Sequence, residues 1–214
     1  MRAPLRAAVC VTVASGLLAA AQASAQMAWD TPRMTGPESP SGLGFYWMRS
    51  GALPGDSDAF FGTWGLPGTD GAVSLRGGVG KGVADENAAF GGLDLRAPIV
   101  RHNDTQPLDL EWTGGAGVGV GEYIVISVPV AVSAGRSWSS GSVWFAPYLS
   151  VGAVLDYRYG DSDLVPDEEF EVLATAGVGA DIAFDPERLF VLRLAMSLGD
   201  RQAVAVGFSV GGAR

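Results

Sequence analysis

Residues 142–159 alternate almost without error between two kinds of side chain, and this regularity restricts the fold more than any other feature of the chain. The odd-numbered positions, from Val143 to Tyr159, are apolar or aromatic, and the even-numbered positions are mostly small, polar or charged. Because successive side chains of a strand point to opposite faces, the pattern predicts one strand with one apolar face. Ordinary strands have about 5–6 residues, whereas roughly 9–11 tilted residues cross a hydrocarbon layer. This segment is long enough to cross one.

The N-terminus has the three parts of an export signal. A basic start with Arg2 and Arg6 precedes an apolar stretch, and the small residues 23–25 offer a cleavage site. We therefore predict that residues 1–25 are a signal peptide that is removed on export. A retained membrane anchor and a lipid attached at Cys10 are the less favoured alternatives.

Removal of this signal changes the charge and the chemistry of the mature chain. It takes away two arginines and no acidic residue, so the formal charge falls from −9 to −11. Such an acidic chain is not expected to bind nucleic acid. The only cysteine is lost with the signal, so no disulfide is expected. With a single histidine and no cysteine left, we predict no transition-metal site and no cofactor.

Segments of period two, separated by turn signals, make up most of the mature chain, and no segment has a helical period long enough to predict a helix. Residues 26–41, rich in proline, predict a flexible lead-in. We expect ten strands, at residues 43–49, 59–66, 72–82, 88–97, 108–120, 123–133, 142–159, 170–184, 189–198 and 203–210. The first two segments have the weakest pattern, so eight strands are the alternative.

Each of these segments has an apolar face, and together the faces predict a membrane protein. In a bilayer every backbone N–H and C=O group must be paired within the protein, so a sheet must close on itself. We predict an all-β fold, a closed antiparallel transmembrane β-barrel of about ten strands over residues 42–211, with apolar faces on lipid and a largely filled lumen. The alternative is a soluble β-sandwich or lipid-binding barrel, in which the apolar faces form an internal core or cavity.

Two sets of side chains follow from this orientation. The first set is charged, lies on the small and polar faces of the predicted strands and should face the lumen, where opposite charges can pair: Arg76, Asp94, Arg96, Asp109, Glu111, Asp181 and Arg193. The second set is aromatic, lies towards predicted strand ends and should form girdles at the two lipid interfaces: Trp112, Tyr157, Phe170, Phe184, Phe190 and Phe208.

The export signal and the even number of alternating segments together resemble the small bacterial outer-membrane β-barrel proteins, over essentially residues 42–211. The resemblance implies residence in the outer membrane, contact with outer-membrane lipids and assembly by the cell's barrel-insertion machinery. Chains of this kind commonly end in an aromatic residue. This chain instead ends six residues after Phe208, its last aromatic residue.

A search for catalytic residues gives a negative prediction. His102, the only histidine, lies in a loop between predicted strands, and no local motif of a Ser–His–acid site accompanies it. Asp109 and Glu111 stand two apart on one face, a spacing that suits acid–base work but equally suits lumen ion pairs. We predict no catalytic residue and no enzyme. A lipid hydrolase with His102 beside a serine is the alternative.

The acidic stretch 161–169 offers oxygen ligands for calcium but lacks the spacing and the glycine of a calcium loop. We predict a solvated loop, with bridging of divalent ions to anionic lipids as the alternative. The sequence as a whole predicts an integral outer-membrane protein with a structural, adhesive or porin-like narrow-channel role. It assigns no specific ligand.

Overall fold

The computed structural model describes residues 29–50, 57–81, 87–121, 123–160 and 168–211. Regular structure in these ranges is β-strand, and none of them forms a helix that could cross a membrane. The predicted signal peptide, residues 1–25, lies outside the described residues, as does most of the acidic stretch, residues 161–167.

The described part of the chain forms one antiparallel sheet. Its strands are β1 (Leu43–Ser50), β2 (Ser57–Gly65), β3 (Val73–Lys81), β4 (Asn87–Val100), β5 (Asp109–Val120), β6 (Ile124–Gly135), β7 (Trp138–Ser140), β8 (Val143–Tyr159), β9 (Glu168–Ala183), β10 (Phe190–Gly199) and β11 (Ala203–Val210).

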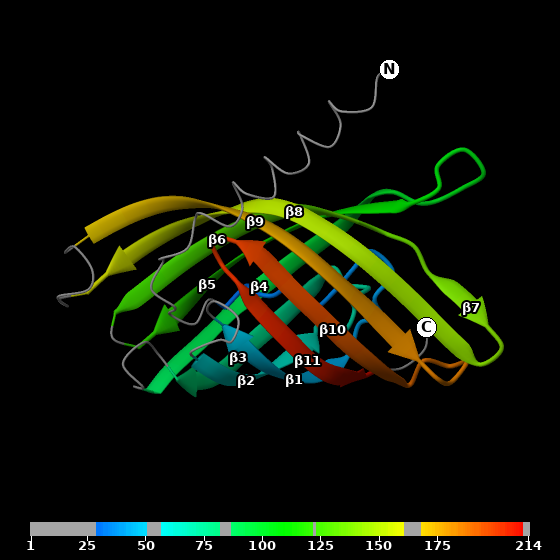
Figure 1. Ribbon diagram of the computed structural model, residues 1–214, viewed down its shortest axis with the longest axis horizontal. Helices are drawn as coiled ribbons and strands as arrows, with labels where there is room; N and C mark the ends of the chain where they lie inside the picture. The colour runs from blue at the N-terminus through cyan, green and yellow to red at the C-terminus, as the bar shows by residue number, and fades with distance from the viewer. Residues whose placement is uncertain (1–28, 51–56, 82–86, 122, 161–167, 212–214) are drawn as a thin grey trace, which may run out of the picture.

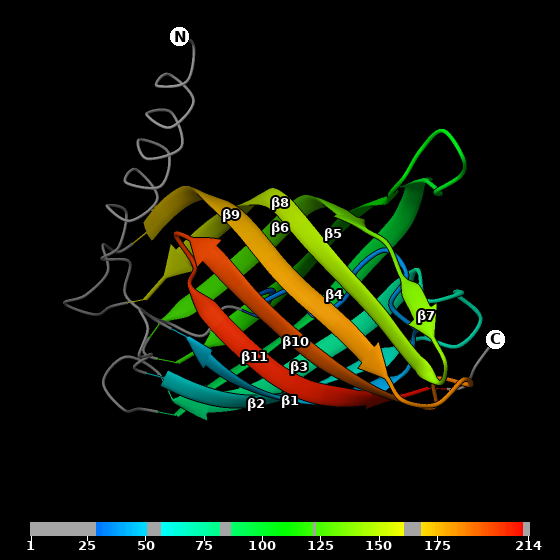
Figure 2. The same ribbon diagram turned by 45° about the vertical axis from the view of Figure 1, so that its right-hand side comes forward.

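The sheet closes into a barrel (Figure 1). Strands β1 to β6 pair in sequence, β6 pairs with β8, and β8 to β11 pair in sequence. Closure comes from β1 and β11, which pair from Leu43↔Val210 to Ser50↔Ala203. The prediction of an all-β fold with a closed antiparallel barrel of ten strands is therefore confirmed, and the alternative of eight strands is wrong. The three residues of β7 pair only with the start of β8, at one end of the barrel (Figure 2).

The predicted strand boundaries agree with the structure to within a few residues. The largest difference is at β4, which continues to Val100 through an irregularity between Pro98 and Val100, where its register with β5 shifts. The other difference is β7, which lies in a connection that was predicted to contain no strand. Both differences occur at the same end of the barrel, where strands extend beyond the regular ladder.

Side chains alternate between the two faces of the barrel wall, and the apolar faces point outward. Along β8, Leu149 and Val151 are 62% and 65% exposed, whereas Trp144 and Tyr148, at even-numbered positions of the same strand, are buried. On β9, Phe170 and Val172 are each 72% exposed. In the described residues the apolar strand faces thus do not form an internal core, because they lie on the outside of the closed sheet.

The two ends of the barrel differ in the connections between strands that lie there. We call the end where β1 begins and β11 ends the terminal mouth, and the opposite end the far mouth. Because the strands alternate in direction, the connections 66–72, 101–108, 136–142 and 184–189 all lie at the terminal mouth. The connection 200–202 lies at the far mouth.

The register of the seam gives a direct test of closure. Trp47 and Val206 are partners across β1 and β11, and directly opposite residues are close enough for a disulfide. We expect the double variant Trp47→Cys, Val206→Cys to form a disulfide on oxidation and to keep a compact gel mobility after boiling. The matched control is Trp47→Cys with Leu192→Cys, two strands away from β1. Cross-linking of the control pair with equal efficiency would contradict the register.

Candidate functional site

Residues 29–41, which we call the inner segment, lie inside the barrel (Figure 2). Trp29 is 1% exposed and Met34 is 3% exposed. The sequence predicted a flexible lead-in over residues 26–41. The structure differs for residues 29–41, because they are enclosed by the barrel wall and hydrogen-bonded to it, and residues 26–28 lie outside the described residues.

The inner segment runs along the axis of the barrel from the far mouth to the terminal mouth. At its start, the Trp29 indole nitrogen donates to the carbonyl oxygen of Ser127, at 3.3 Å, near the beginning of β6. The indole ring lies against Gly92 and Gly117, where a methyl group on either glycine would overlap it. At its end, the segment reaches Gly42, whose carbonyl oxygen accepts a hydrogen bond from the Gly65 N–H group at 3.1 Å.

The barrel wall donates hydrogen bonds to the backbone of the inner segment. A buried chain without secondary structure has carbonyl groups that need donors, and its prolines reduce the number of N–H groups that need acceptors. The donors are the side chains of four arginines and one tyrosine, Arg76, Arg96, Arg101, Arg193 and Tyr148. They reach the carbonyl oxygens of Thr31, Pro32, Arg33, Met34, Pro37, Ser39 and Pro40.

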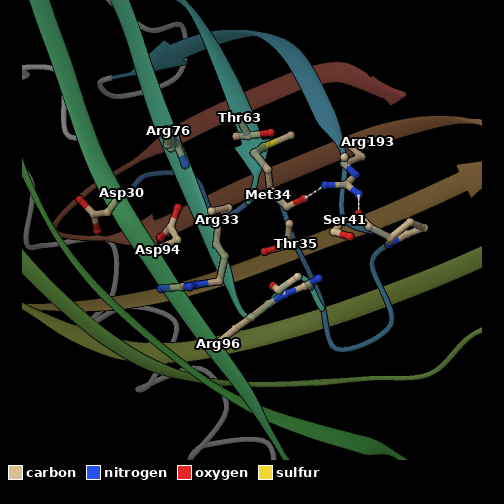
Figure 3. A pocket seen from close by; sticks show the side chains of 15 residues that line it. Asp30, Arg33, Met34, Thr35, Ser41, Thr63, Arg76, Asp94, Arg96 and Arg193 are labelled. Carbon is tan, nitrogen blue, oxygen red and sulfur yellow. Dashed lines mark hydrogen bonds between the residues drawn. The ribbon is translucent and has the colours of Figure 1, made fainter. Parts of the chain in front are cut away.

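Figure 3 shows the middle of this arrangement, with Arg193 bonded to the backbone beside Met34. Arg76 holds two successive carbonyl oxygens, each at 2.8 Å. The cavity left between the inner segment and the wall is small, about 30 Å³. The lumen is therefore filled along this stretch, as the sequence predicted, but largely by a segment that the sequence did not place there.

Ion pairs also lie in the lumen. Arg201, in the connection at the far mouth, pairs with Asp30 of the inner segment and with Asp156 of β8. In the middle of the barrel, the Arg193 Nε atom lies 3.6 Å from a carboxylate oxygen of Asp181, and both side chains are buried. Buried charges are stable only when paired or hydrogen-bonded, so these contacts allow the lumen to hold ionised groups without bulk water.

All seven residues predicted to face the lumen lie on the inner face. Five are buried, namely Arg76, Asp109, Glu111, Asp181 and Arg193. The other two, Asp94 and Arg96, are half-buried and line the cavity of Figure 3.

The pairing of these charges differs from the prediction in its geometry. Asp181 and Arg193 are partners in the register of neighbouring strands rather than opposite one another across the lumen. The space across the lumen is occupied by the inner segment, so the arginines mostly find their partners there. Trp29, Asp30 and Arg201 were not predicted from the sequence, because they lie in the predicted lead-in and in a predicted turn.

The six aromatic residues predicted to form girdles all lie on the outer face, towards the two ends of the barrel. At the terminal mouth the rings of Phe190 and Phe208 stack with centroids 5.1 Å apart. Trp112, near the start of β5, and Phe184, directly after β9, lie towards the same end of the barrel. At the far mouth the rings of Tyr157 and Phe170 are 4.7 Å apart. Whether these residues contact lipid remains a prediction.

A cluster of one imidazole and two carboxylates lies at the terminal mouth. The His102 Nδ1 atom is 2.6 Å from Asp109 Oδ2 and 3.4 Å from Glu38 Oε1. The His102 backbone N–H donates to Asp109 Oδ1 at 3.0 Å. Burial and the hydrogen bond to Asp109 raise the pKa of the Glu38 carboxyl group. From the sequence we expect His102 to be a solvated loop residue, and it is exposed, yet its Nδ1 atom is hydrogen-bonded to Asp109 and lies near Glu38.

This cluster borders an open cavity of about 780 Å³ at the terminal mouth, which is also lined by Glu111, Arg96 and Arg188. An imidazole oriented by a carboxylate is one part of a hydrolytic triad. The hydrolase alternative needs a serine hydroxyl at the ring as well, and the partners of the ring in the described residues are the carboxylates of Asp109 and Glu38. The donor set of the cluster equally suits a cation.

Comparison with known proteins finds no matching family model, no matching curated protein and no matching solved structure. We therefore infer the function from the geometry of the barrel, of the inner segment and of the cluster.

Retention of the inner segment can be tested by proteolysis. Arg33 lies within the lumen, so trypsin should cut after it only slowly in the folded protein. Trp29→Ala removes a fully buried aromatic side chain, a change that typically costs about 3–5 kcal/mol. We expect this variant to be cleaved at Arg33 much faster, as measured by mass spectrometry. The matched control Trp64→Ala removes a tryptophan that is 50% exposed on the outer face, and equal acceleration in both variants would contradict the assignment.

Proposed function

We propose that this chain is an integral outer-membrane β-barrel protein whose lumen is closed by its own inner segment, with a structural and non-enzymatic role in this closed state. The observation that carries the proposal is the distribution of side chains on the barrel wall. Every one of the ten barrel strands exposes valine, leucine, isoleucine or aromatic side chains, whereas the buried charged side chains in the middle of the strands, such as Arg76, Asp181 and Arg193, lie on the inner face.

The extent of this outer apolar surface supports a lipid environment. Val130 on β6, Val151 on β8 and Val172 on β9 are 58%, 65% and 72% exposed, and these strands are consecutive neighbours in the barrel. Soluble monomers rarely expose contiguous apolar patches larger than a few hundred Å². A membrane barrel instead has an apolar band around its whole circumference, between two aromatic girdles.

Backbone closure supports the same environment. A sheet in hydrocarbon cannot leave an edge unpaired, because each unpaired backbone group costs several kcal/mol there. The pairing of β1 with β11 along all eight residues of each strand removes the edge. The predicted export signal, residues 1–25, supports the outer membrane as the destination, with outer-membrane lipids and the barrel-insertion machinery as partners.

The filled lumen favours a closed barrel over an open narrow channel. The inner segment fills the lumen down to a cavity of about 30 Å³ beside its middle part. A narrow-channel role would require the inner segment to leave. The soluble lipid-binding barrel is the second candidate, but a binding site inside the barrel would compete with the inner segment and with the buried charges around it.

Membrane integration can be tested by fractionation. We expect the full chain, expressed with its signal, to remain in outer membranes after a carbonate wash and to migrate differently on a mild detergent gel before and after boiling. Closed membrane barrels resist unfolding at room temperature because their wall hydrogen bonds form one continuous ring. Release by carbonate as a soluble β protein would contradict the proposal and favour the lipid-binding barrel.

Closure of the lumen can be tested by conductance in planar bilayers. We expect the intact protein to give no steady current and a variant lacking residues 29–41, behind the intact signal, to give a small ohmic one. The difference in gel mobility before and after boiling serves to check that the variant still folds. A matched control is deletion of residues 103–106, which shortens a loop at the terminal mouth but leaves the lumen filled. A steady current through the intact protein would contradict a closed lumen.

A further inference from the structure

Three elements that are distant in sequence meet in the cluster at the terminal mouth. Glu38 belongs to the inner segment, His102 to the connection between β4 and β5, and Asp109 to the first position of β5. Each offers one ligand atom, and these atoms lie within 4.8 Å of one another. The inner segment, a loop and the barrel wall therefore contribute one donor each to a single point.

The distances in the cluster are close to those of a tetrahedral metal site. Zinc lies about 2.0–2.2 Å from imidazole nitrogen and carboxylate oxygen, which places neighbouring ligand atoms about 3.3 Å apart. The separation of His102 Nδ1 from Glu38 Oε1 is already 3.4 Å. The separation of His102 Nδ1 from Asp109 Oδ2 is 2.6 Å, so it must widen by about 0.7 Å to admit an ion.

The orientation of Asp109 fits a metal ligand. Its Oδ1 atom accepts the His102 backbone N–H at 3.0 Å, and the Arg101 Nη1 atom lies 3.9 Å from the same oxygen. Its Oδ2 atom is the one that faces the imidazole. A hydrogen bond from outside the site that fixes one carboxylate oxygen is a common second layer of a metal site, and a bound ion would take the place of the hydrogen bond between Oδ2 and the imidazole.

A second, independent feature points to a cation. Glu111 lies two residues beyond Asp109 on the same inner face, is 3% exposed and borders the same cavity. Its Oε1 atom is buried and has no hydrogen-bond partner in the described residues. An isolated buried carboxylate oxygen is costly, and a cation in this cavity would offset that cost. Five carboxylates line this cavity, because Asp70 and Glu187 join Glu38, Asp109 and Glu111, and three arginines face them, Arg96, Arg101 and Arg188. The lining therefore has a formal excess of two negative charges, which a divalent cation would neutralise.

We propose that the terminal mouth binds one divalent transition-metal ion of the zinc class through Glu38, His102 and Asp109, with Glu111 as a fourth donor either directly or through a water molecule. An imidazole with carboxylates suits zinc and its neighbours, whereas calcium takes six to eight oxygen ligands. The sequence predicts no such site, because it holds one histidine and gives no local signal that Glu38 lies beside it.

The ion would join the inner segment to the barrel. Because one ligand lies on the segment and the others on the wall and loop, binding favours the closed lumen over any state in which the segment has moved. The site itself depends only on the barrel and the inner segment, so it does not rest on the proposed membrane location.

The experiment is zinc binding by isothermal titration calorimetry, on full-length mature protein in detergent, stripped with a chelator and carrying no histidine tag. Cobalt serves as a spectroscopic probe, because tetrahedral cobalt with mixed nitrogen and oxygen ligands absorbs visible light. We expect one zinc ion per chain, loss of binding in His102→Ala and at least a tenfold weaker affinity in Glu38→Gln. The matched control Asp104→Asn changes an exposed carboxylate of the same loop and should bind zinc as the unchanged protein does.

A second readout separates a built site from surface binding. Zinc should slow trypsin cleavage at Arg33 in the unchanged protein and have no such effect in Glu38→Gln, whose folding is checked by its gel mobility before and after boiling. The proposal is overturned if the unchanged protein binds no zinc at micromolar concentration. It is equally overturned if His102→Ala and Glu38→Gln bind as well as the control, which would mean that the ion binds adventitiously elsewhere.

Discussion

The pairing of β1 with β11 is the constraint on which the rest of this structure depends. It joins the two ends of the sheet into a ring and leaves no unpaired edge on the ten barrel strands. Ring closure also fixes the diameter, since about ten strands enclose a space only wide enough for side chains and little more. Once that space exists, the period-two alternation decides its contents, because each strand must turn one set of side chains inward. The narrow and polar lumen therefore follows from the closure of the sheet by the pairing of β1 with β11.

Within that lumen, buried hydrogen-bond donors and buried hydrogen-bond acceptors complement each other. Arg76 and Arg193 are buried cations, and burial of a cation requires acceptors. The inner segment is a buried chain without secondary structure, and its carbonyl groups require donors. Arg76 alone meets two carbonyl groups at 2.8 Å each. Neither the arginines nor the segment would be stable in this position alone, and the neutral carbonyl groups supplement the limited number of carboxylates.

The strands were predictable from the sequence because their signal is local. In β8 the alternation of apolar and polar side chains indicates which face of the strand each residue lies on. The closed ring then follows from the number of strands and from the need to pair every strand edge. The inner segment was not predictable in the same way. A run with three prolines indicates the absence of regular structure, which is a different property from mobility. The hydrogen-bond partners of the segment are also distant in sequence, since Arg76 lies 44 residues from Pro32 and Arg193 lies 159 residues from Met34. The same holds for the cluster at the terminal mouth, where His102 and Asp109 are neighbours in sequence but Glu38 reaches them only through the path of the inner segment.

The axial course of the inner segment has a consequence for how it can leave. The ten strands of the closed wall are hydrogen-bonded to one another, so the segment cannot pass between them and can leave only along the barrel axis. The contact of Trp29 with β6 near one end, the hydrogen bonds from the arginines in the middle and the contact of Glu38 with His102 near the other end would all have to break within the same movement. Contacts that break together add their costs to one barrier rather than to several small ones. The residence time of the segment in the barrel should therefore be much longer than the strength of any single contact would suggest.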